Sequence, residues 1–478
     1  MTPSLFIAGH WTAGCGSRSG PVLDPATGEE VGRVPFAEAA DLDVALAAAA
    51  RGFALWRATS AFERSGVLRR AAALLRERHE AIATAITREQ GKPLGEAKLE
   101  VLGAADHVDW GAEEGRRAYG RVIPARAPDV TQMVVQEPVG PVAAFSPWNF
   151  PVSQLVRKIA GALAAGCSII AKAPEETPTS AVLTVRCFEE AGLPAGVLQL
   201  VFGVPAEISE RLIASPVIRK VSFTGSVAVG RHLSQLAGRH LKRATMELGG
   251  HAPFIVGAGV DPAPVAALAA QMKFRNAGQV CVSPTRFLVH ESLFESFVEA
   301  FAARASALTL GSGLDPATGM GPLAQARRVQ AVEALVRDAV DEGAEIRTGG
   351  RRAGNQGFFF EPTILTTVPL AARVLNEEPF GPIAVVNPFA ALDDAIAEAN
   401  RLPFGLAAYA MTNGLVEAEK LGAGIEAGMV SINHSGLALP ETPFGGIKDS
   451  GHGSEGGVEG LRAYLQDKFV SRRHALGG

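Results

Sequence analysis

The sequence contains little cysteine and shows no strong excess of charge of either sign. Its 478 residues include four cysteines, too few for a disulfide framework in a chain of this length. None of them forms a CxxC pair or joins a histidine cluster with metal-ligand spacing, so we expect no metal site. The formal net charge of −4 gives no electrostatic reason to bind nucleic acid or an anionic membrane.

Long apolar runs are also missing. The longest, Ile159 to Ala171, is too short to span a bilayer. The first residues, Met1 to Ile7, lack the basic region and the apolar segment of a secretory signal. We therefore expect a cytoplasmic protein with reduced thiols and no membrane partner. The composition that remains, 47% hydrophobic and 20% charged, is typical of a globular chain long enough for two or three domains.

From Pro138 onward, short apolar runs alternate with amphipathic segments, which predicts βαβ units around a parallel sheet. The stretch before them, Leu42 to Glu113, is rich in alanine and favours helix. The expected strands and helices after Pro138 are, in order, Val142–Phe145, Ser153–Ala165, Ser168–Ala171, Thr179–Ala191, Val197–Phe202, Ala206–Ala214, Arg219–Phe223 and Val227–Leu236.

A second region of this kind runs from about His251 to Gly446. Two further segments, Ala118–Gln136 and Ala463–Ser471, fit neither region, and their β-prone composition predicts exposed ribbons. Unpaired strand edges invite association with a second subunit, so we expect a homo-oligomer. The expected strands of the second region are Phe254–Val256, Arg286–Val289, Ile383–Val386 and Met429–Ile432.

Cys281 is the candidate nucleophile. It follows a predicted helix, Pro264–Phe274, and precedes Pro284, so we expect it in a turn. Taken alone, a single cysteine is more often a small buried hydrophobe than a nucleophile. A free thiol with a pKa of about 8.5 is only a few per cent thiolate at neutral pH, so a reactive one needs help from its surroundings.

Two polar residues next to predicted strands are candidates for that help. Glu247 ends an apolar strand just before two glycines, where it is either a turn ligand or a general base that activates water. Asn149 follows a predicted strand in the string Ser-Pro-Trp-Asn. It is either an ordinary turn residue or an amide that donates to a developing oxyanion.

A dinucleotide site is indicated by the segment Phe223–Ser226, which joins a predicted strand to a predicted helix. Gly225 permits a tight turn, and Ser226 with the free N–H groups of the helix start forms an anion site suited to a pyrophosphate. Lys172 and Glu175 follow another predicted strand. They are either surface charges or a pair that binds ribose hydroxyls.

Taken together, these motifs resemble those of the aldehyde dehydrogenase superfamily over nearly the whole chain, in the family's order and at its spacing. Where many members have isoleucine, Pro379 stands in one of the strings, a change that we expect to be tolerated. The matching strings are Pro147-Trp-Asn-Phe-Pro151, Phe223-Thr-Gly-Ser226, Glu247-Leu-Gly-Gly250, Gly278-Gln-Val-Cys281, Glu377-Glu-Pro-Phe-Gly-Pro382 and Pro443-Phe-Gly-Gly-Ile-Lys448.

The resemblance implies an α/β fold with a Rossmann-like cofactor domain, an α/β catalytic domain and a small β ribbon for oligomerisation into a homodimer or homotetramer. The implied boundaries are 1–117 and 138–248 for the NAD-binding domain, 249–446 for the catalytic domain, and 118–137 and 447–478 for the oligomerisation and bridging segments.

The resemblance also assigns roles to single residues. Cys281 is the nucleophile, Glu247 the base, and Asn149 with the Cys281 backbone N–H the oxyanion hole; Lys172 is counted with the catalytic residues as well as with the cofactor. The residues assigned to the cofactor are Pro147, Trp148, Lys172, Glu175, Gly225, Ser226, Leu248, Glu378 and Phe380. Those assigned to the substrate are Arg157, Arg275, Phe150 and Phe444.

The implied reaction oxidises an aldehyde to a carboxylic acid through a thiohemiacetal and a thioester on Cys281. Acylating relatives, which pass the acyl group to coenzyme A, usually lack the base, so Glu247 favours the hydrolytic branch. Glu175 occupies the position where the family contacts the adenosine ribose. Its carboxylate accepts from the 2′- and 3′-hydroxyls and repels a 2′-phosphate, so we expect NAD, with NADP as the alternative.

Arg157 and Arg275 match positions that bind the distal carboxylate in the succinate-semialdehyde dehydrogenase branch, and the planar fork of arginine suits a carboxylate. An internal ion pair is the other explanation for each. Together they favour succinate or glutarate semialdehyde. The segment Leu437–Pro440 lacks the hydroxyl that this branch often supplies. Ser283 stands where the branch has its second thiol, so we expect no disulfide switch.

Three alternatives remain open on the sequence. One is a broad-specificity aldehyde dehydrogenase for neutral aldehydes. Another is a cofactor-independent cysteine hydrolase or acyltransferase, which needs a histidine near Cys281; the candidates are His251, His290 and His434. A non-enzymatic cofactor-binding scaffold is disfavoured because all three catalytic positions are occupied.

Overall fold

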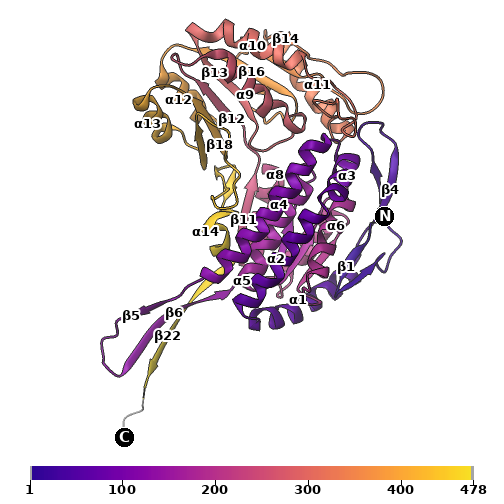
Figure 1. Cartoon of the computed structure of the whole chain (residues 1–478), viewed down its shortest axis with the longest axis vertical. Coiled ribbons are helices and arrows are strands. Elements are labelled where there is room, and N and C mark those ends of the chain that lie inside the picture. Colours follow the sequence, from indigo (N-terminus) through magenta and orange to yellow (C-terminus); the bar gives the residue numbers. More distant parts are fainter. Residues whose placement is uncertain (1–2, 475–478) are drawn as a thin grey trace.

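The computed structural model describes residues 3–474. Two large sheets, each flanked by helices, form the two ends of the body, and a three-stranded antiparallel ribbon projects away from it (Figure 1). The predicted α/β architecture is therefore confirmed. No helix in this described range is long and apolar enough to cross a membrane.

The first sheet has the strand order β2-β1-β9-β8-β7-β10-β11-β21. Its five central strands are parallel, and β1 and β21 close the two sides with antiparallel pairing. The strand bounds are β1 Leu5–Ile7, β2 His10–Thr12, β7 Val142–Phe145, β8 Ile169–Lys172, β9 Leu198–Val201, β10 Lys220–Gly225, β11 Arg243–Leu248 and β21 Gly451–His452.

Eight helices accompany this sheet, and the alternation predicted after Pro138 is confirmed. Three of them, α5, α6 and α7, begin at a proline one or two residues before the predicted start, because proline is pre-organised for the first helical position. The helices are α1 Ala39–Ala58, α2 Ala61–Glu77, α3 His79–Gln90, α4 Leu94–Glu114, α5 Pro151–Ala165, α6 Pro178–Glu190, α7 Pro205–Ala214 and α8 Val227–Arg239.

The second sheet has the order β14-β15-β16-β13-β12-β18-β19 and is parallel except for β14. All four strands predicted for this region are present. The strands are β12 Ala252–Val256, β13 Pro284–His290, β14 Glu345–Thr348, β15 Thr363–Thr366, β16 Ile383–Phe389, β18 Ala407–Met411 and β19 Met429–Ile432. The helices are α9 Pro262–Phe274, α10 Phe294–Ser306, α11 Ala326–Asp341, α12 Leu392–Asn400 and α13 Leu415–Gly424.

The ribbon joins the two segments that fit neither region. Strand β22 (Leu465–Arg473) pairs antiparallel with β6 (Val130–Pro138) over nine residue pairs, and β5 (Arg121–Ile123) pairs with the other edge of β6. The predicted pairing is confirmed. The smaller elements are β3 Ser19–Leu23, β4 Glu30–Pro35, β17 Phe404–Gly405, β20 Ile447–Lys448, α14 Gly457–Arg462, and the short helices η1 Gly115–Arg117, η2 Arg275–Gly278, η3 Glu291–Leu293 and η4 Arg373–Leu375.

The central strands of both sheets are buried on both faces, as expected of parallel strands covered by helices, and each sheet has its own large apolar cluster. The carboxyl ends of the parallel strands share one edge of the first sheet. Register places Phe145 of β7 beside Lys172 of β8, and Thr224 of β10 beside Glu247 of β11. Ligands of open α/β sheets bind outside this edge, so it is where a site is expected.

Candidate active site

A cavity of about 210 Å³ lies beside Cys281, which is half-buried in its wall. Cys281 lies in a turn between η2 and β13, as the sequence predicts. The backbone before it is strained: Asn276 and Ala277 adopt left-handed conformations with φ of 49° and 51°. The lining also includes Glu96, Leu99, Glu100, Gly103, His107, Phe150, Ser153, Gln154, Arg157, Arg275, Val280, Val282, Ala438 and Phe444.

Asn149 lies against the cysteine loop. Its side-chain amide donates a hydrogen bond to the carbonyl of Gln279, two residues before Cys281, at 3.0 Å. Its backbone carbonyl accepts from the side-chain amide of Asn276 at 3.0 Å and from Lys92 at 2.7 Å. The structure therefore brings the predicted amide donor into contact with the segment that carries the predicted nucleophile.

Glu247 is buried on β11, and neither of its carboxylate oxygens has a hydrogen-bond partner in the described part of the chain. Burial raises its pKa well above the usual value; the charge of Glu455 adds to this effect, while Lys158 and Arg157 oppose it. A carboxyl with a high proton affinity and no fixed partner is suited to taking up a proton.

Burial also raises the pKa of the Cys281 thiol, to about 12, with the negative charges of Glu378 and Glu247 adding to the effect and Arg157 opposing it. The resting thiol is therefore neutral. Arg157 lines the same cavity as Cys281, so the sulfur is not isolated in packed hydrocarbon, whereas Glu247 is not among the described residues of that lining.

The cofactor motifs meet at the edge of the first sheet. Ser226 caps α8 by accepting from the backbone N–H of Val229 at 3.5 Å. A Cβ on Gly225 would lie 2.4 Å from the Phe223 ring, and one on Gly230 would lie 2.2 Å from Leu248. These glycines bring the start of α8 close to the strands, where free N–H groups suit a phosphate.

Lys172 and Glu175 form an ion pair of 2.6 Å at the end of β8, and the other oxygen of Glu175 accepts from the backbone N–H of Gly203 at 2.8 Å. They are therefore not independent surface charges. Among the described residues, those that line the cavity at Cys281 do not include Lys172. Its ion pair with Glu175 supports only the cofactor assignment.

Glu378 is held beside the glycines that follow Glu247. Its carboxylate accepts from the N–H of Gly250 at 3.2 Å, and burial raises its pKa to about 7. Phe380, which has a left-handed φ of 42°, meets Trp148 edge-on at 5.7 Å between ring centroids; Pro147 precedes that ring in the same turn. A buried carboxyl and an aromatic wall thus border the same sheet edge, an arrangement that fits a dinucleotide.

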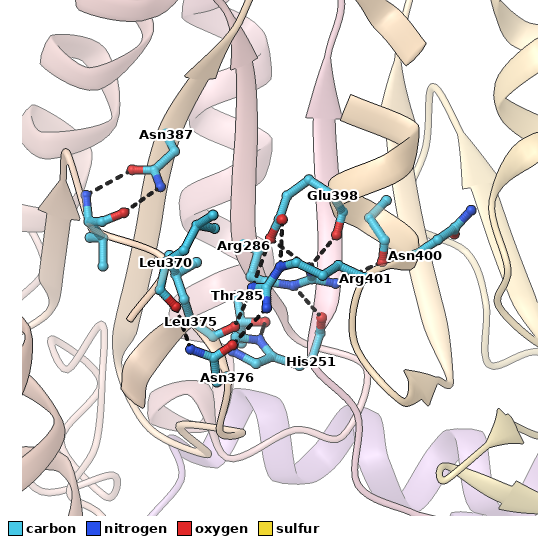
Figure 2. A network of polar contacts seen from close by, with 12 residues as sticks. His251, Thr285, Arg286, Leu370, Leu375, Asn376, Asn387, Glu398, Asn400 and Arg401 are labelled. Atoms are coloured by element: carbon cyan, nitrogen blue, oxygen red, sulfur yellow. Dashed lines mark hydrogen bonds and ion pairs between the residues drawn. The ribbon is translucent and has the colours of Figure 1, made fainter. Parts of the chain in front are cut away.

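A polar network, buried at His251 and Arg286 and exposed at Arg401, supports the segment that leads to Glu378 (Figure 2). His251 contacts the carbonyl of Val374 through its ring Nε2 at 3.0 Å. Arg401 donates to the side-chain carbonyl of Asn376 at 2.7 Å, two residues before Glu378. The network ties this segment to the chain that follows Glu247 and Cys281, since His251, just before β12, and Thr285 and Arg286 of β13 contribute to it.

The cysteine hydrolase alternative requires a histidine beside Cys281. Of the three candidates, none is among the described residues that line the cavity. His251 uses both ring nitrogens in hydrogen bonds, and His290 and His434 bond to residues close to them in the chain. The histidine that does line the cavity is His107, which the sequence gave no reason to select.

All four predicted substrate residues line the cavity. The guanidinium of Arg157 lies 4.4 Å from the ring centre of Phe444, and that of Arg275 lies 5.2 Å from the ring centre of Phe150. Neither arginine forms an ion pair with any residue from 3 to 474, so the structure gives no support to the internal ion pair. Both cations remain available to a ligand.

Sequence reasoning missed two buried ion pairs that support the site. Lys92 binds Glu100 at 2.6 Å, and Glu100 also accepts from the N–H groups of Val152 and Ser153 at the start of α5, at 2.9 and 3.1 Å. Lys92 stands between a glycine and a proline, and Glu100 lies within a long helix. No local signal distinguishes them from exposed charges.

The second pair joins Lys158 to Glu455. Lys158 also donates to the hydroxyl of Thr224 at 2.7 Å, and Glu455 raises the proton affinity of Glu247. The partners are 297 residues apart in the chain, so the sequence could not reveal the pair. Among residues 3–474, no group of three or more His, Cys, Asp or Glu side chains could hold a metal ion.

A thiol, a carboxyl without a hydrogen-bond partner among residues 3–474 and an amide donor, beside the edge of a Rossmann-like sheet, fit the site of a thiol-dependent oxidoreductase. The model of the Aldehyde dehydrogenase family matches residues 11–470, and the chain belongs to this family. Its members use NAD(P). The glycine-rich start of α8 and the carboxyls at the sheet edge are compatible with such a cofactor.

Individual relatives are similar over almost the full length. A putative 4-(hydroxymethyl)benzenesulfonate dehydrogenase from Comamonas testosteroni is 51% identical over 98% of each chain. The NADP-dependent succinate-semialdehyde dehydrogenase of Escherichia coli K12 is 41% identical over 97% of this chain and 96% of its own. The NAD+ complex of an aldehyde dehydrogenase from Bacillus cereus is 32% identical, with a TM-score of 0.96 over 99% of this chain and 97% of its own.

Proposed function

We propose that this protein is a hydrolytic, non-acylating aldehyde dehydrogenase that oxidises an anionic aldehyde, such as succinate or glutarate semialdehyde, to the carboxylic acid with NAD(P)+. The observation that carries the proposal is the cavity at Cys281, where two arginines that form no ion pair with residues 3–474 line the same space as the thiol. Arginine recognises carboxylates through its planar fork of donors.

The reaction follows from the groups on this chain. The Cys281 sulfur bonds to the aldehyde carbon, and its proton passes to Glu247, a role that the high proton affinity of this carboxyl supports. The resulting oxyanion accepts hydrogen bonds from the Asn149 amide and the Cys281 backbone N–H. Bound NAD(P)+ supplies the acceptor for the hydride that leaves this carbon.

The thioester that remains on Cys281 is then hydrolysed. Glu247 first releases the proton that it took from the thiol to solvent. It then takes a proton from water, the hydroxide adds to the thioester carbon, and the carbon–sulfur bond breaks to release the acid and the thiolate. Because the Glu247 carboxyl has no hydrogen-bond partner in the part of the chain that the structure describes, it is free to orient toward that water. This base is what favours hydrolysis over transfer to coenzyme A.

The residues that would hold the cofactor are Pro147, Trp148, Lys172, Glu175, Gly225, Ser226, Leu248, Glu378 and Phe380. Within this set, Glu175 supports NAD over NADP, since its carboxylate repels a 2′-phosphate. Lys172 neutralises part of that charge, so the preference is moderate. We expect Glu175→Gln to raise the ratio of kcat/KM with NADP to kcat/KM with NAD about tenfold, measured by initial rates. An unchanged ratio would remove Glu175 from this role.

The names of two relatives agree with an acidic substrate. One carries benzenesulfonate in its name and the other succinate semialdehyde. A sulfonated aldehyde is therefore the second candidate, because a sulfonate offers arginine the same kind of oxygen acceptors as a carboxylate. Neutral aldehydes form the third, since Phe150 and Phe444 provide apolar walls and the segment Leu437–Pro440 carries no side-chain hydroxyl.

The domain division also belongs to the proposal: an NAD-binding domain of residues 1–117 and 138–248, a catalytic domain of residues 249–446, and oligomerisation and bridging segments of residues 118–137 and 447–478. The exposed ribbon residues Tyr119, Val122 and Phe469 support association into a homodimer or homotetramer. We place the enzyme in the cytoplasm.

The deciding experiment follows NADH or NADPH formation with succinate semialdehyde, glutarate semialdehyde, a sulfonated benzaldehyde and butanal, each with and without coenzyme A. We expect reduced cofactor with the acidic aldehydes, and the free acid as product even when coenzyme A is present. Arg275→Ala should lose the preference for acidic over neutral aldehydes. Absence of cofactor reduction with ester hydrolysis intact would favour the cysteine hydrolase, and absence of both would favour the scaffold.

A further inference from the structure

Arg157 has more hydrogen-bonding capacity than its neighbours in the protein use. Its Nη2 donates to the carbonyl of Ala438 at 3.3 Å. Its Nε and Nη1 are buried and have no acceptor among the described residues, and the residue as a whole is only 7% exposed. A buried N–H without an acceptor is costly, and more so on a charged group. An acceptor close to these two nitrogens is therefore expected.

A second, smaller cavity lies behind Arg157, and we call it the inner chamber. It has a volume of about 30 Å³ and is enclosed by α4, α5 and α14, which pack against one another (Figure 1). Arg157 and His107 line both the inner chamber and the cavity at Cys281, so they form the wall between the two. Glu455 and Tyr464 line the inner chamber only.

His107 presents an acceptor to this space. Its Nδ1 lies 2.8 Å from the carbonyl of Gly103, and a carbonyl only accepts, so Nδ1 carries the proton. Burial, followed by the charge of Arg157, lowers the pKa of His107 to about 4, and the ring is neutral at physiological pH. Its Nε2 is then a buried acceptor without a partner in residues 3–474.

Glu455 presents a second acceptor. One of its carboxylate oxygens binds Lys158, whereas Oε2 is buried and has no partner in the described chain. A buried water occupies about 10–15 Å³ and needs two to four polar partners. The volume of the inner chamber and the spare groups on Arg157, His107 and Glu455 meet both requirements for about two water molecules.

We propose that the inner chamber binds buried water that links Arg157 to His107 and Glu455, and that His107 is thereby a positioning residue for recognition of the substrate's acidic group. This inference rests on the proposed function, in which Arg157 binds that group. With Nε and Nη1 held from behind, the guanidinium stays oriented against Phe444. The acidic group of the substrate then binds a guanidinium that is already oriented, so less side-chain entropy of Arg157 is lost on binding.

The test compares KM for succinate semialdehyde with KM for butanal, a neutral aldehyde of the same chain length. His107→Leu removes the acceptor and should raise the ratio of the two KM values about tenfold, with a smaller change in kcat. His107→Gln should restore most of the ratio, because its amide oxygen can accept where Nε2 did. Val108→Ala, a buried change on the same helix, is the control for loss of packing; it should lower Tm and leave the ratio unchanged.

Arg157→Met separates this inference from the proposed function. If Arg157→Met abolishes the preference for the acidic aldehyde and folded His107→Leu does not change it, the inference is wrong and the proposed function stands. If neither variant changes the preference, both are wrong. A crystal structure of the unmodified enzyme gives a test that does not depend on the variants: water within hydrogen-bonding distance of His107 Nε2 and Arg157 Nη1 supports the inference, and a dry chamber overturns it.

Discussion

Two groups of buried polar residues near the carboxyl edge of the first sheet differ in whether their polar atoms have hydrogen-bond partners. Lys92 and Glu100 are paired at 2.6 Å, and both make further hydrogen bonds to backbone groups around Asn149 and the start of α5. Glu247 and the Nε and Nη1 atoms of Arg157 have no hydrogen-bond partner in the described part of the protein. The first group therefore has its partners within the described protein, and these atoms of the second group do not.

The difference shows which residues hold geometry and which are left free to react. A paired buried charge fixes the groups that it contacts, and breaking it leaves its partner uncompensated. An unpaired buried acid instead changes its proton affinity, as the raised pKa values of Cys281 and Glu247 show. The strained residue Asn276 donates to the Asn149 carbonyl, which also accepts from Lys92 of the paired group.

The largest expected effect comes from removing the sulfur. Cys281→Ala should lower kcat for aldehyde oxidation by at least about 10⁴-fold, because no covalent intermediate can form. Binding of the cofactor, followed by quenching of tryptophan fluorescence, should be retained, because the cofactor residues lie on other elements. Oxidation at the wild-type rate in this variant would show that the Cys281 thiol is not the nucleophile.

Removing the unpaired carboxyl should have the next largest effect. Glu247→Gln should lower the steady-state rate about 10²–10⁴-fold, the range typical of a lost general base. If acyl transfer to Cys281 survives, stopped-flow absorbance should show a burst of about one reduced cofactor per active site before the slow phase. A steady-state rate close to that of the wild type would contradict the role of Glu247 in hydrolysis.

Breaking the paired group should reduce stability. Lys92→Met leaves Glu100 buried without its cation and should lower the free energy of unfolding by about 3–5 kcal/mol, measured by denaturant titration. Replacing both partners, Lys92→Met with Glu100→Gln, should recover part of the loss. The matched control is Lys98→Met, which breaks the exposed pair with Glu80 and should change stability little.

The smallest effect is a dependence on pH. Since burial holds the pKa of Cys281 near 12, the thiolate fraction rises about tenfold for each pH unit below that value. Alkylation of Cys281 by iodoacetamide in the absence of cofactor should therefore accelerate continuously from pH 7 to pH 9. The Cys281→Ser variant gives the background from the other three cysteines. A plateau below pH 8 would mean that a neighbouring group ionises the thiol.

Much of the fold follows from patterns within single segments. The strand Val142–Phe145 agrees with the prediction at both ends, because a run of apolar residues bounded by proline and serine marks a buried parallel strand. Strand β21 was not predicted. It has only two residues, and its pairing with β11 depends on a loop that returns from more than 200 residues away.

The sequence predicts those site residues that stand in short distinctive motifs. It does not predict those whose role depends on being buried by packing between distant helices. Cys281, Glu247 and Asn149 each stand in a distinctive string near a strand end. Lys158 and His107, in contrast, lie within helices, where a charge or a histidine usually faces solvent. Their burial arises from packing of α4 and α5 against each other and against α14, which no local pattern encodes.

The pairing of β22 with β6 has a consequence for how the chain is made. Gln136 of β6 and Asp467 of β22 are 331 residues apart, so β6 is synthesised long before its partner leaves the ribosome. One edge of β6 must wait as an unprotected strand while both sheets fold. Early termination before Leu465 would leave that edge open permanently, and such truncated chains should be the ones that aggregate or engage chaperones.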